Sequence, residues 1–196
     1  METRKKIVES ARILFNRHGF ETVTIDRVME AAGLTRGGFY NHFSSKEELY
    51  CEAVSSFLMG RGAEWRSGAG VDALQPDSES ATRMVASYLS ADHLGDLDGQ
   101  CPMIALPSDI ARASDEVRSA YEDLLRAMVG LFEVSLKKKQ VRPRPRRRRA
   151  LALAALCVGG MVLARTLPNS ALANDVREAA LMTAGDLLRA PSTKRS

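Results

Sequence analysis

Apolar residues recur along most of this chain at spacings of three and four positions, which is the period of a helix with one buried face. The runs Ile7–Phe15 and Val117–Leu136 both follow this pattern. No stretch alternates β-branched and polar residues as a half-buried strand does, and no Asn-Gly hairpin turn occurs. The pattern therefore predicts an all-α fold of about nine helices. The helices are expected at about residues 4–18, 25–32, 36–42, 46–61, 78–89, 102–112, 115–138, 150–165 and 170–189.

The stretch from Thr24 to Phe43 predicts two short helices joined by a tight turn. Thr24 is a good N-cap for the first helix, because its hydroxyl can accept a hydrogen bond from a backbone N–H of the first turn. Gly33 ends that helix at a position where a positive φ is usually needed. Thr35 is the next candidate N-cap and opens the second helix at Arg36. Two helices around a short glycine-containing turn are typical of a helix-turn-helix.

The surface of the second helix favours contact with nucleic acid. Its first turn contains Gly37 and Gly38, and each glycine costs about 1 kcal/mol relative to alanine within a helix. Glycines at such a position allow a backbone to approach another surface closely. Arg36 could pair with guanine in a major groove, and Tyr40 and His42 offer hydrogen-bond donors to phosphates. On the pattern alone, an ordinary helical corner with solvated polar residues remains the alternative.

The sequence from about Arg4 to Arg61 resembles the DNA-binding domain of TetR-family transcriptional repressors. The matching positions are Ala32-Gly33, Thr35, Gly37, Tyr40, His42-Phe43, Lys46 and Leu49. The resemblance implies that the helix from Arg36 enters the major groove while Tyr40, His42 and Lys46 hold phosphates. Gly38 departs from the family, where many relatives have Thr, Ala or Ser, so any contact from that side chain is lost. The expected DNA-binding residues are Thr24, Thr35, Arg36, Gly37, Gly38, Tyr40, Asn41, His42 and Lys46.

Charge and cysteine content add little to this interpretation. The net charge of +4 and the pI of about 9.1 are a mild bias towards nucleic acid. Three widely spaced cysteines indicate a reduced, cytosolic protein, and we expect it to be associated with the nucleoid. The N-terminus lacks the features of a signal peptide. Its residues Arg4, Lys5 and Lys6 either lie near the DNA backbone or form a solvated tail.

A change in composition after residue 61 predicts a domain boundary. Residues 1–61 are expected to form the DNA-binding domain, with three helices followed by the linking helix at about residues 46–61, and residues 62–196 a C-terminal ligand-binding and dimerisation domain. Trp65 is expected in an interrupted stretch, because Gly68, Gly70 and Pro76 indicate a loop. The segment 90–100, rich in Asp and Gly, is also expected to be a loop, without the ligand order of a calcium site.

Residues 137–149, KKKQVRPRPRRRR, are predicted to form an exposed basic connection, because Pro143 and Pro145 are unfavourable in a regular helix. This connection could contact DNA or an acidic partner, or it could be a solvated loop. The apolar run at residues 150–165 falls short of the ~20 residues that cross a bilayer. We therefore expect a helix buried on several sides, and no membrane partner.

A homodimer is expected for two reasons. One recognition helix covers only a few base pairs, so helix-turn-helix proteins commonly pair to read a palindromic operator in double-stranded DNA. The two C-terminal helices also carry more apolar surface than one small subunit can bury, and the resemblance implies that they form a four-helix interface with their symmetry mates. The interface candidates are Leu153, Leu156, Gly160, Leu163, Val176, Ala180 and Leu187.

The family resemblance also implies a C-terminal pocket for a small-molecule effector, whose binding releases the operator. For each residue of this pocket, ordinary core packing is the alternative. The candidates are Trp65, Met84, Tyr88, Cys101, Met103, Tyr121, Met128 and Met161.

Cys101 is a special case among the pocket candidates. It is predicted to be the N-cap of a helix opened by Pro102, where a thiolate is stabilised. Some TetR-like regulators carry a cysteine near this helix start that responds to electrophiles or oxidants. A structural cysteine remains the alternative.

Two other classes of function find less support in the sequence. The three histidines, His18, His42 and His93, lack metal-ligand spacing with a cysteine or carboxylate, and no nucleophile elbow or P-loop is present. We therefore predict no enzymatic activity, catalytic residue, metal or cofactor. A helical adaptor that binds protein partners without DNA is the alternative function.

Overall fold

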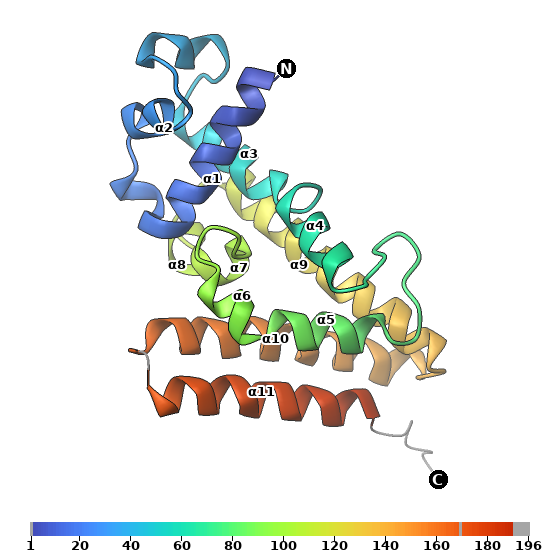
Figure 1. The fold of residues 1–196 in the computed structure, drawn as a ribbon. Helices are drawn as coiled ribbons and strands as arrows, with labels where there is room; N and C mark the ends of the chain where they lie inside the picture. Colours follow the sequence, from blue (N-terminus) through green and yellow to red (C-terminus); the bar gives the residue numbers. More distant parts are fainter. Residues whose placement is uncertain (1, 169, 190–196) are drawn as a thin grey trace. The chain divides into compact units, whose positions relative to one another are not determined.

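The computed structural model describes residues 2–168 and 170–189 (Figure 1). Within these ranges the chain forms eleven α-helices, one 3₁₀ helix and no strand, so the all-α prediction is confirmed and the expected helix number was slightly low. The helices belong to two compact units. Unit 1 comprises the described residues up to Gly62 together with Asp96–Leu124, and unit 2 comprises Ala63–Gly95 together with the described residues from Leu125 onwards. The domain boundary expected at residue 61 stays a prediction.

Unit 1 is built around the packing of α1 (Glu2–Thr22) on α3 (Lys46–Ser56). Between them in sequence lie α2 (Ile25–Ala31) and the 3₁₀ helix η1 (Arg36–Asn41). Three aromatic rings join α1 to α3: Tyr50 lies 4.8 Å from Phe15 and 4.7 Å from Phe20, measured between ring centroids. The short helices α7 (Pro102–Ala105) and α8 (Pro107–Ile110) complete the unit, with the first ten residues of α9 (Asp115–Lys138).

Unit 2 contains two long helices that lie side by side, α10 (Pro143–Thr166) and α11 (Ala171–Arg189), with α5 (Ser80–Tyr88) against both (Figure 1). Neighbouring helices satisfy both ends of α5. Ser135 on α9 accepts a hydrogen bond from the Ala81 N–H at 3.1 Å, and Arg177 on α11 donates to the Leu89 carbonyl at 2.7 Å. These bonds fix α5 by its free backbone groups as well as by its apolar face.

Several helix boundaries differ from the prediction in the middle of the chain. The helix expected at residues 46–61 stops at Ser56, and α4 (Arg61–Gly68) begins after a turn in which the Gly60 and Gly62 N–H groups donate to Ser56 and Phe57. Glycine is a poor helix former, which explains the break. Trp65 therefore lies in a helix and not in the expected loop.

The segments on either side of residue 100 also differ from the prediction. The expected loop at residues 90–100 contains α6 (Ala91–Gly95), because the Ser90 hydroxyl accepts the His93 N–H at 3.1 Å and caps the helix. The single helix expected at residues 102–112 is two helices, α7 and α8. Pro107 separates them, because it lacks the N–H that would continue the first helix.

The prediction that residues 137–149 form an exposed loop was wrong. Pro143 and Pro145 occupy the first turn of α10, where the missing proline N–H groups would have no helical partner in any case. The helix is consequently 24 residues long, not about 16. By length and composition alone, α10 is the one helix among the described residues that could cross a membrane. In the protein it packs against α5 and α11.

Candidate nucleic-acid interface

Local hydrogen bonds set the shape of the turn between α2 and η1. The Thr24 hydroxyl accepts the Arg27 N–H at 3.3 Å, as expected for the N-cap of α2. At the other end Gly33 has a φ of 71°, and the Leu34 N–H donates to the Met29 carbonyl at 2.8 Å. The Gly33 N–H donates to the Glu30 carbonyl, which completes a Schellman motif. The predicted capping and the positive φ are both present.

The second helix of the motif differs from the prediction in its type. An α-helix was expected from Arg36 to His42, but η1 is a 3₁₀ helix with Gly38 N–H donating to the Thr35 carbonyl at 3.0 Å. Thr35 takes the N-cap position without a side-chain hydrogen bond. Two glycines in the first turn weaken an α-helix, and short runs with i to i+3 bonds are the common alternative. Phe39 is fully buried and stacks on Phe43, with 5.6 Å between centroids, so it fixes η1 to the core.

The two glycines of η1 are not required by packing inside the protein. A Cβ atom at Gly37 would meet nothing within 4 Å, and one at Gly38 would make only an ordinary contact with Met29. Neither glycine has a positive φ. The glycines therefore leave η1 without protruding side chains at these positions, for reasons other than the stability of the unit.

Arg36 already has a partner in the free protein. Its guanidinium lies 2.8 Å from the Asp26 carboxylate, and both side chains are more than half exposed. Exposed ion pairs of this kind contribute about 0–1 kcal/mol, so a guanine base could replace Asp26 at small cost. Lys46 is held differently, with its ammonium 4.1 Å from the centroid of the Phe20 ring.

The start of α3 combines two capping interactions. The Ser45 hydroxyl accepts the Glu48 N–H at 3.0 Å, and the Glu48 carboxylate accepts both the backbone N–H and the hydroxyl of Ser44 at 2.7 Å. The hydrogen bonds from Ser44 lower the pKa of Glu48. They hold the loop between η1 and α3, and thereby the position of Lys46.

The expected DNA-binding residues all belong to unit 1, and each of them is at least partly exposed. Tyr40 is the large hydrophobic residue of this set, and 61% of its surface is exposed. Gly38, His42 and Lys46 are half-buried. The exposed members are Thr24, Thr35, Arg36, Gly37, Tyr40 and Asn41.

The N-terminal charges lie in helix α1 and not in a tail, and whether they lie near the DNA backbone stays a prediction. Arg4 pairs with Glu52 and Glu48 on α3, and its guanidinium lies 4.4 Å from the centroid of the Phe43 ring. Arg4 thus has a structural role in unit 1. Lys5 and Lys6 are exposed on the first turns of α1.

A second group of polar contacts, which the sequence pattern did not reveal, fixes residues 96–109 to α1. Arg12 is 3% exposed and donates to the carbonyl of Asp98, while Asn16 donates to the Gln100 carbonyl at 2.8 Å. Arg17 forms a two-point ion pair with the Asp98 carboxylate, which lowers the pKa of Asp98. The only sequence signal for this group was a charged residue, Arg12, on the apolar face of the first helix.

The group of contacts ends at the interruption of α1. Gly19 has a φ of 76° and a ψ of 168°, so the predicted end of the helix is present as a break, after which α1 continues to Thr22. The break leaves the Phe20 N–H without a helical acceptor, and the Asp109 carboxylate accepts it at 3.0 Å. We call the contacts of Arg12, Asn16, Arg17 and Phe20 with residues 98–109 the α1 latch.

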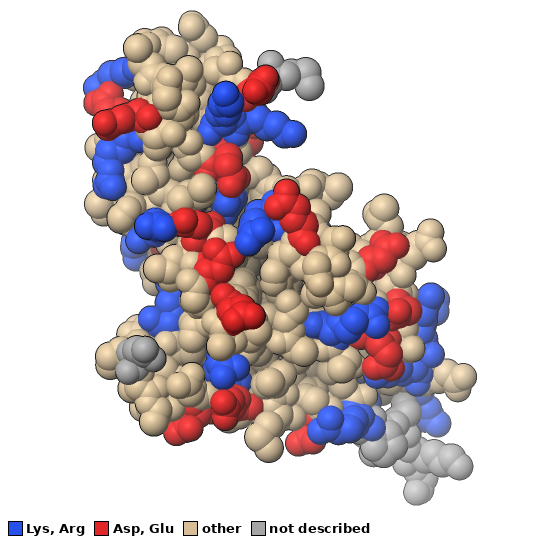
Figure 2. All heavy atoms as spheres, viewed as in Figure 1, with Lys and Arg blue, Asp and Glu red and all other residues tan. Residues whose placement is uncertain are grey.

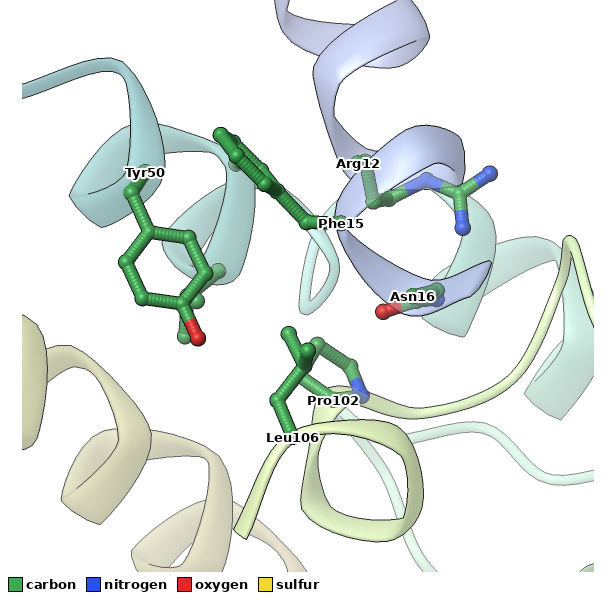
Figure 3. A pocket seen from close by; sticks show the side chains of 8 residues that line it. Arg12, Phe15, Asn16, Tyr50, Pro102 and Leu106 are labelled. Carbon is green, nitrogen blue, oxygen red and sulfur yellow. The ribbon is translucent and has the colours of Figure 1, made fainter. Parts of the chain in front are cut away.

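Beneath the α1 latch is a narrow gap between side chains that has no room for a water molecule (Figure 3). Figure 3 shows Tyr50 facing Phe15 and Asn16 on one side and Pro102 and Leu106 on another. The Tyr50 side chain is 1% exposed, and its hydroxyl has no hydrogen-bond partner among the described residues. Burial raises the pKa of Tyr50 well above its usual value. The space is an imperfectly packed contact and not a ligand site.

The expected effector-pocket residues fall into both units. In unit 2, the Trp65 ring lies 5.7 Å from that of Tyr88 and 4.9 Å from that of His93, measured between centroids. His93 was not among the expected residues, because its segment was predicted to be a loop. It is buried, with Nδ1 2.8 Å from the Tyr88 carbonyl oxygen. Three methionines are buried in the same unit: Met84, Met128 and Met161.

The other three pocket candidates lie in unit 1. Cys101 is 2% exposed and takes the predicted N-cap position of α7, without a side-chain capping bond. Met103 is buried, and its carbonyl accepts a hydrogen bond from the Tyr121 hydroxyl at 3.4 Å. Burial raises the pKa of Tyr121, and the nearby Cys101 adds to this effect.

The expected dimer residues differ in their exposure. Leu153, Gly160 and Ala180 are buried inside unit 2, where a Cβ at Gly160 would come within 2.7 Å of Ala180. Gly160 on α10 and Ala180 on α11 thus pack against each other within the subunit. Leu163 is 56% exposed. Leu156, Val176 and Leu187 are half-buried.

The N-terminal segment of the sequence matches a known protein family. The family model described as "Bacterial regulatory proteins, tetR family" matches residues 7–53. The transcriptional repressor AcnR of Corynebacterium efficiens is 42% identical over 50 residues, which are 26% of this chain and 27% of AcnR. The TetC protein of transposon Tn10 from Escherichia coli is 45% identical over 47 residues, 24% of each chain. The match thus spans about a quarter of these relatives.

Solved structures resemble nearly the whole chain in fold. The reduced form of E. coli NemR superposes with a TM-score of 0.73 at 18% identity, over 97% of this chain and 100% of that one. A TetR-family regulator from Cytophaga hutchinsonii gives a TM-score of 0.74 at 21% identity, over 95% and 93%. At such low identity these likenesses concern the fold alone.

Proposed function

We propose that this chain, whose N-terminal segment matches the tetR family of bacterial regulatory proteins, is a repressor that binds a palindromic operator as a homodimer. The observation that carries the proposal is the outer side of η1. Arg36 and Tyr40 are exposed there beside two glycines that packing does not require, while Phe39 anchors the helix from below. This exposed side of η1 is suited to lie against a groove of DNA.

The proposal assigns different tasks to Arg36 and Lys46. Arg36 reads a base, and Arg36→Ala should cost about 1–3 kcal/mol at one operator position while relaxing its specificity. Lys46 holds a phosphate, and Lys46→Ala should weaken all sequences alike and lower the salt slope by about 1. Arg118→Ala is the matched control, because Arg118 is exposed on α9 and paired with Asp115.

Fluorescence anisotropy with labelled duplexes at several salt concentrations measures both effects. Equal affinities of the wild type and both variants for every duplex would contradict the assignment. Binding that ignores salt would favour the adaptor alternative, because the release of counterions from phosphates is absent from apolar docking.

We place the dimer contact on the outer face of α10 and α11. Four large apolar side chains of α10 and α11 are between 45% and 71% exposed: Leu151, Leu163, Leu172 and Met182. A negative charge at Leu163 would have to be buried unpaired in such an interface, which is strongly unfavourable. Light scattering should therefore give the mass of two chains for the wild type and of one chain for Leu163→Glu. Leu74→Glu, at a position 91% exposed outside this face, should remain a dimer.

We place the effector beside Trp65, Tyr88 and His93, whose rings form one aromatic cluster in unit 2. An apolar or aromatic molecule suits this cluster, since ring faces favour offset or edge contacts. Trp65 is the single tryptophan of the chain, so its fluorescence reports on the site directly. An effector should change that fluorescence and release DNA at the same concentration. Release of DNA without a change at Trp65 would place the effector elsewhere.

An electrophile or oxidant acting at Cys101 is the second form of release that we propose. Its support is the position of Cys101 at the start of α7, one residue from Gln100 in the α1 latch. Burial of the thiol means that the reaction would require a local opening. Cys101→Ser should bind DNA normally and resist release by oxidant. Equal sensitivity of Cys101→Ser and the wild type would leave Cys101 as a structural residue.

A further inference from the structure

The positive charge of this chain is concentrated in one segment. Residues 137–149 contain nine lysines and arginines and no acidic residue. The whole chain has 28 basic and 24 acidic residues, so the rest of it carries 19 against 24 and is net negative by five charges. The helix-turn-helix is therefore not where the basic excess of the sequence lies.

The structure places these charges together on unit 2, where α9 ends and α10 begins. We call residues 137–149 the basic cap. Its exposed cations are Lys137, Lys138, Arg142, Arg144, Arg147 and Arg148. Figure 2 shows blue side chains along the right-hand edge of the view, over this end of α9 and α10. Two acidic residues form ion pairs with the cap: Glu133 pairs with Arg147 at 3.2 Å, and Glu79 pairs with Lys139 at 3.1 Å.

The charges of the cap oppose the stability of the helix that carries them. The first turn of a helix has a partial positive charge, so acidic residues are favourable there and basic residues are not. α10 has no acidic residue in its first turn, and arginines follow its two prolines. Arg144 and Arg148 also have no ion pair or hydrogen bond with any described residue. A sequence that breaks a local rule without a gain in packing points to a function for those residues.

The composition of the cap favours the phosphate backbone of a duplex over other polyanions. Arginine presents a planar fork that matches phosphate oxygens. The cap has no aromatic residue on which unpaired bases could stack, as single-strand binding commonly requires. An interfacial membrane helix needs a broad apolar face beside its basic one, but Ala150, Leu153 and Ala154 are buried inside unit 2, and among residues 150–155 only Leu151 and Ala155 are exposed.

We propose that the basic cap is a second DNA-binding surface, which holds the phosphate backbone of duplex DNA without reading its sequence. It is separate from the helix-turn-helix in sequence and belongs to the other compact unit. Its contribution is electrostatic, so it increases the affinity for operator and non-operator DNA by the same factor and leaves their ratio unchanged.

The test compares the full-length wild type with Arg144→Gln/Arg148→Gln on a duplex of scrambled sequence, by fluorescence anisotropy across a salt series. Each lost phosphate contact lowers the salt slope by about 0.9, so the double variant should lose about 2 from the slope and about tenfold in affinity at low salt. The control is Arg118→Gln/Arg189→Gln. It removes the same formal charge from two exposed arginines that are paired on their own helices, and it should change neither quantity.

Two further measurements distinguish a DNA contact of the basic cap from a structural role of its arginines. The melting temperature of Arg144→Gln/Arg148→Gln should equal or exceed that of the wild type, because two cations leave the positive end of α10. A lower melting temperature together with weaker binding would mean that the residues are structural and would overturn the proposal. Lys46→Ala should weaken DNA binding by the same factor in the wild type and in Arg144→Gln/Arg148→Gln. The proposal for the basic cap and the proposal for the helix-turn-helix can therefore fail independently of each other.

Three further results would overturn the proposal. One is an unchanged salt slope in the double variant. Another is an equal loss in the paired-arginine control, which would reflect net charge alone. The third is tighter binding to vesicles of equimolar phosphatidylglycerol and phosphatidylcholine than to the duplex, lost in the double variant, which would assign the cap to a membrane surface.

Discussion

Replacement of Gly19 by alanine tests the α1 latch at its most constrained position. Gly19 has a φ of 76° and a ψ of 168°, a region of backbone space that is essentially restricted to glycine. A Cβ atom there would lie 2.7 Å from Oδ2 of Asp109, closer than such atoms approach in proteins. The carboxylate would have to move away, and it would then lose its hydrogen bond from the Phe20 N–H.

The expected destabilisation has two parts. The strained backbone conformation costs about 1–3 kcal/mol, and a lost hydrogen bond to a charged group costs about 1.5–3 kcal/mol. The sum for Gly19→Ala is roughly 2.5–6 kcal/mol. Gly33→Ala is the matched control, because Gly33 also has a positive φ, of 71°, but a Cβ atom there would meet nothing within 4 Å. The control should cost only about 1–2 kcal/mol.

Urea unfolding of both variants, followed by circular dichroism at fixed protein concentration, measures the difference. A double-mutant cycle with Asp109→Ala isolates the contact: if Gly19→Ala has already removed it, Asp109→Ala should cost less in that background than in the wild type. Equal destabilisation by Gly19→Ala and Gly33→Ala would refute the reasoning, because the contact with Asp109 would then contribute nothing. So would additive effects of Gly19→Ala and Asp109→Ala.

Three other substitutions have defined outcomes. Tyr50→Phe should raise stability by about 1 kcal/mol, since the buried hydroxyl has no partner among the described residues. It should also reduce the loss of stability above pH 10, where the unfolded but not the folded tyrosine ionises. Urea unfolding at several pH values measures both effects, and a variant less stable than the wild type would contradict the first. Hydrogen bonds from Arg83 lower the pKa of Asp77 from 3.8 to about 2, so the stability that the ionised Asp77 contributes is present above pH 3.8 and is lost as pH falls through 2. The melting temperature of Asp77→Asn should therefore change less with pH in this range. An unchanged profile would count against the Asp77–Arg83 pair. Ser135→Ala should cost about 1–3 kcal/mol in thermal melts, because the Ala81 N–H loses its acceptor, and a neutral effect would mean that water replaces the hydroxyl.

The parts of the fold that the sequence predicted are those encoded locally. The helix at residues 115–138 has the predicted bounds, because its apolar period is long and unbroken. The cap at Thr24 and the positive φ of Gly33 also follow from neighbouring residues alone. Prolines were the main source of error. Pro143 and Pro145 favoured a loop in the prediction because proline is unfavourable inside a helix, but both fit within a first turn.

The contacts that the sequence could not predict are distant along the chain. Asn16 and Gln100 are 84 positions apart, and Phe20 and Asp109 are 89 apart. No periodicity relates such pairs, and a single sequence contains no covariation. The exposed positions of η1 were predicted because the family resemblance and the local pattern agreed. Which side of α10 faces its own subunit was not predictable, because the run at residues 150–165 is apolar all round.

Selection of bound duplexes from a random DNA pool tests most directly whether η1 reads an operator. We predict that the purified protein enriches an inverted repeat with half-sites about one helical turn apart, or a multiple of it, and that Arg36→Ala loses preference at one position of each half-site. The protein must be folded and dimeric by light scattering in the same buffer. No enrichment at low salt, or an enriched sequence that Arg36→Ala binds equally well, would contradict the claim that η1 reads an operator.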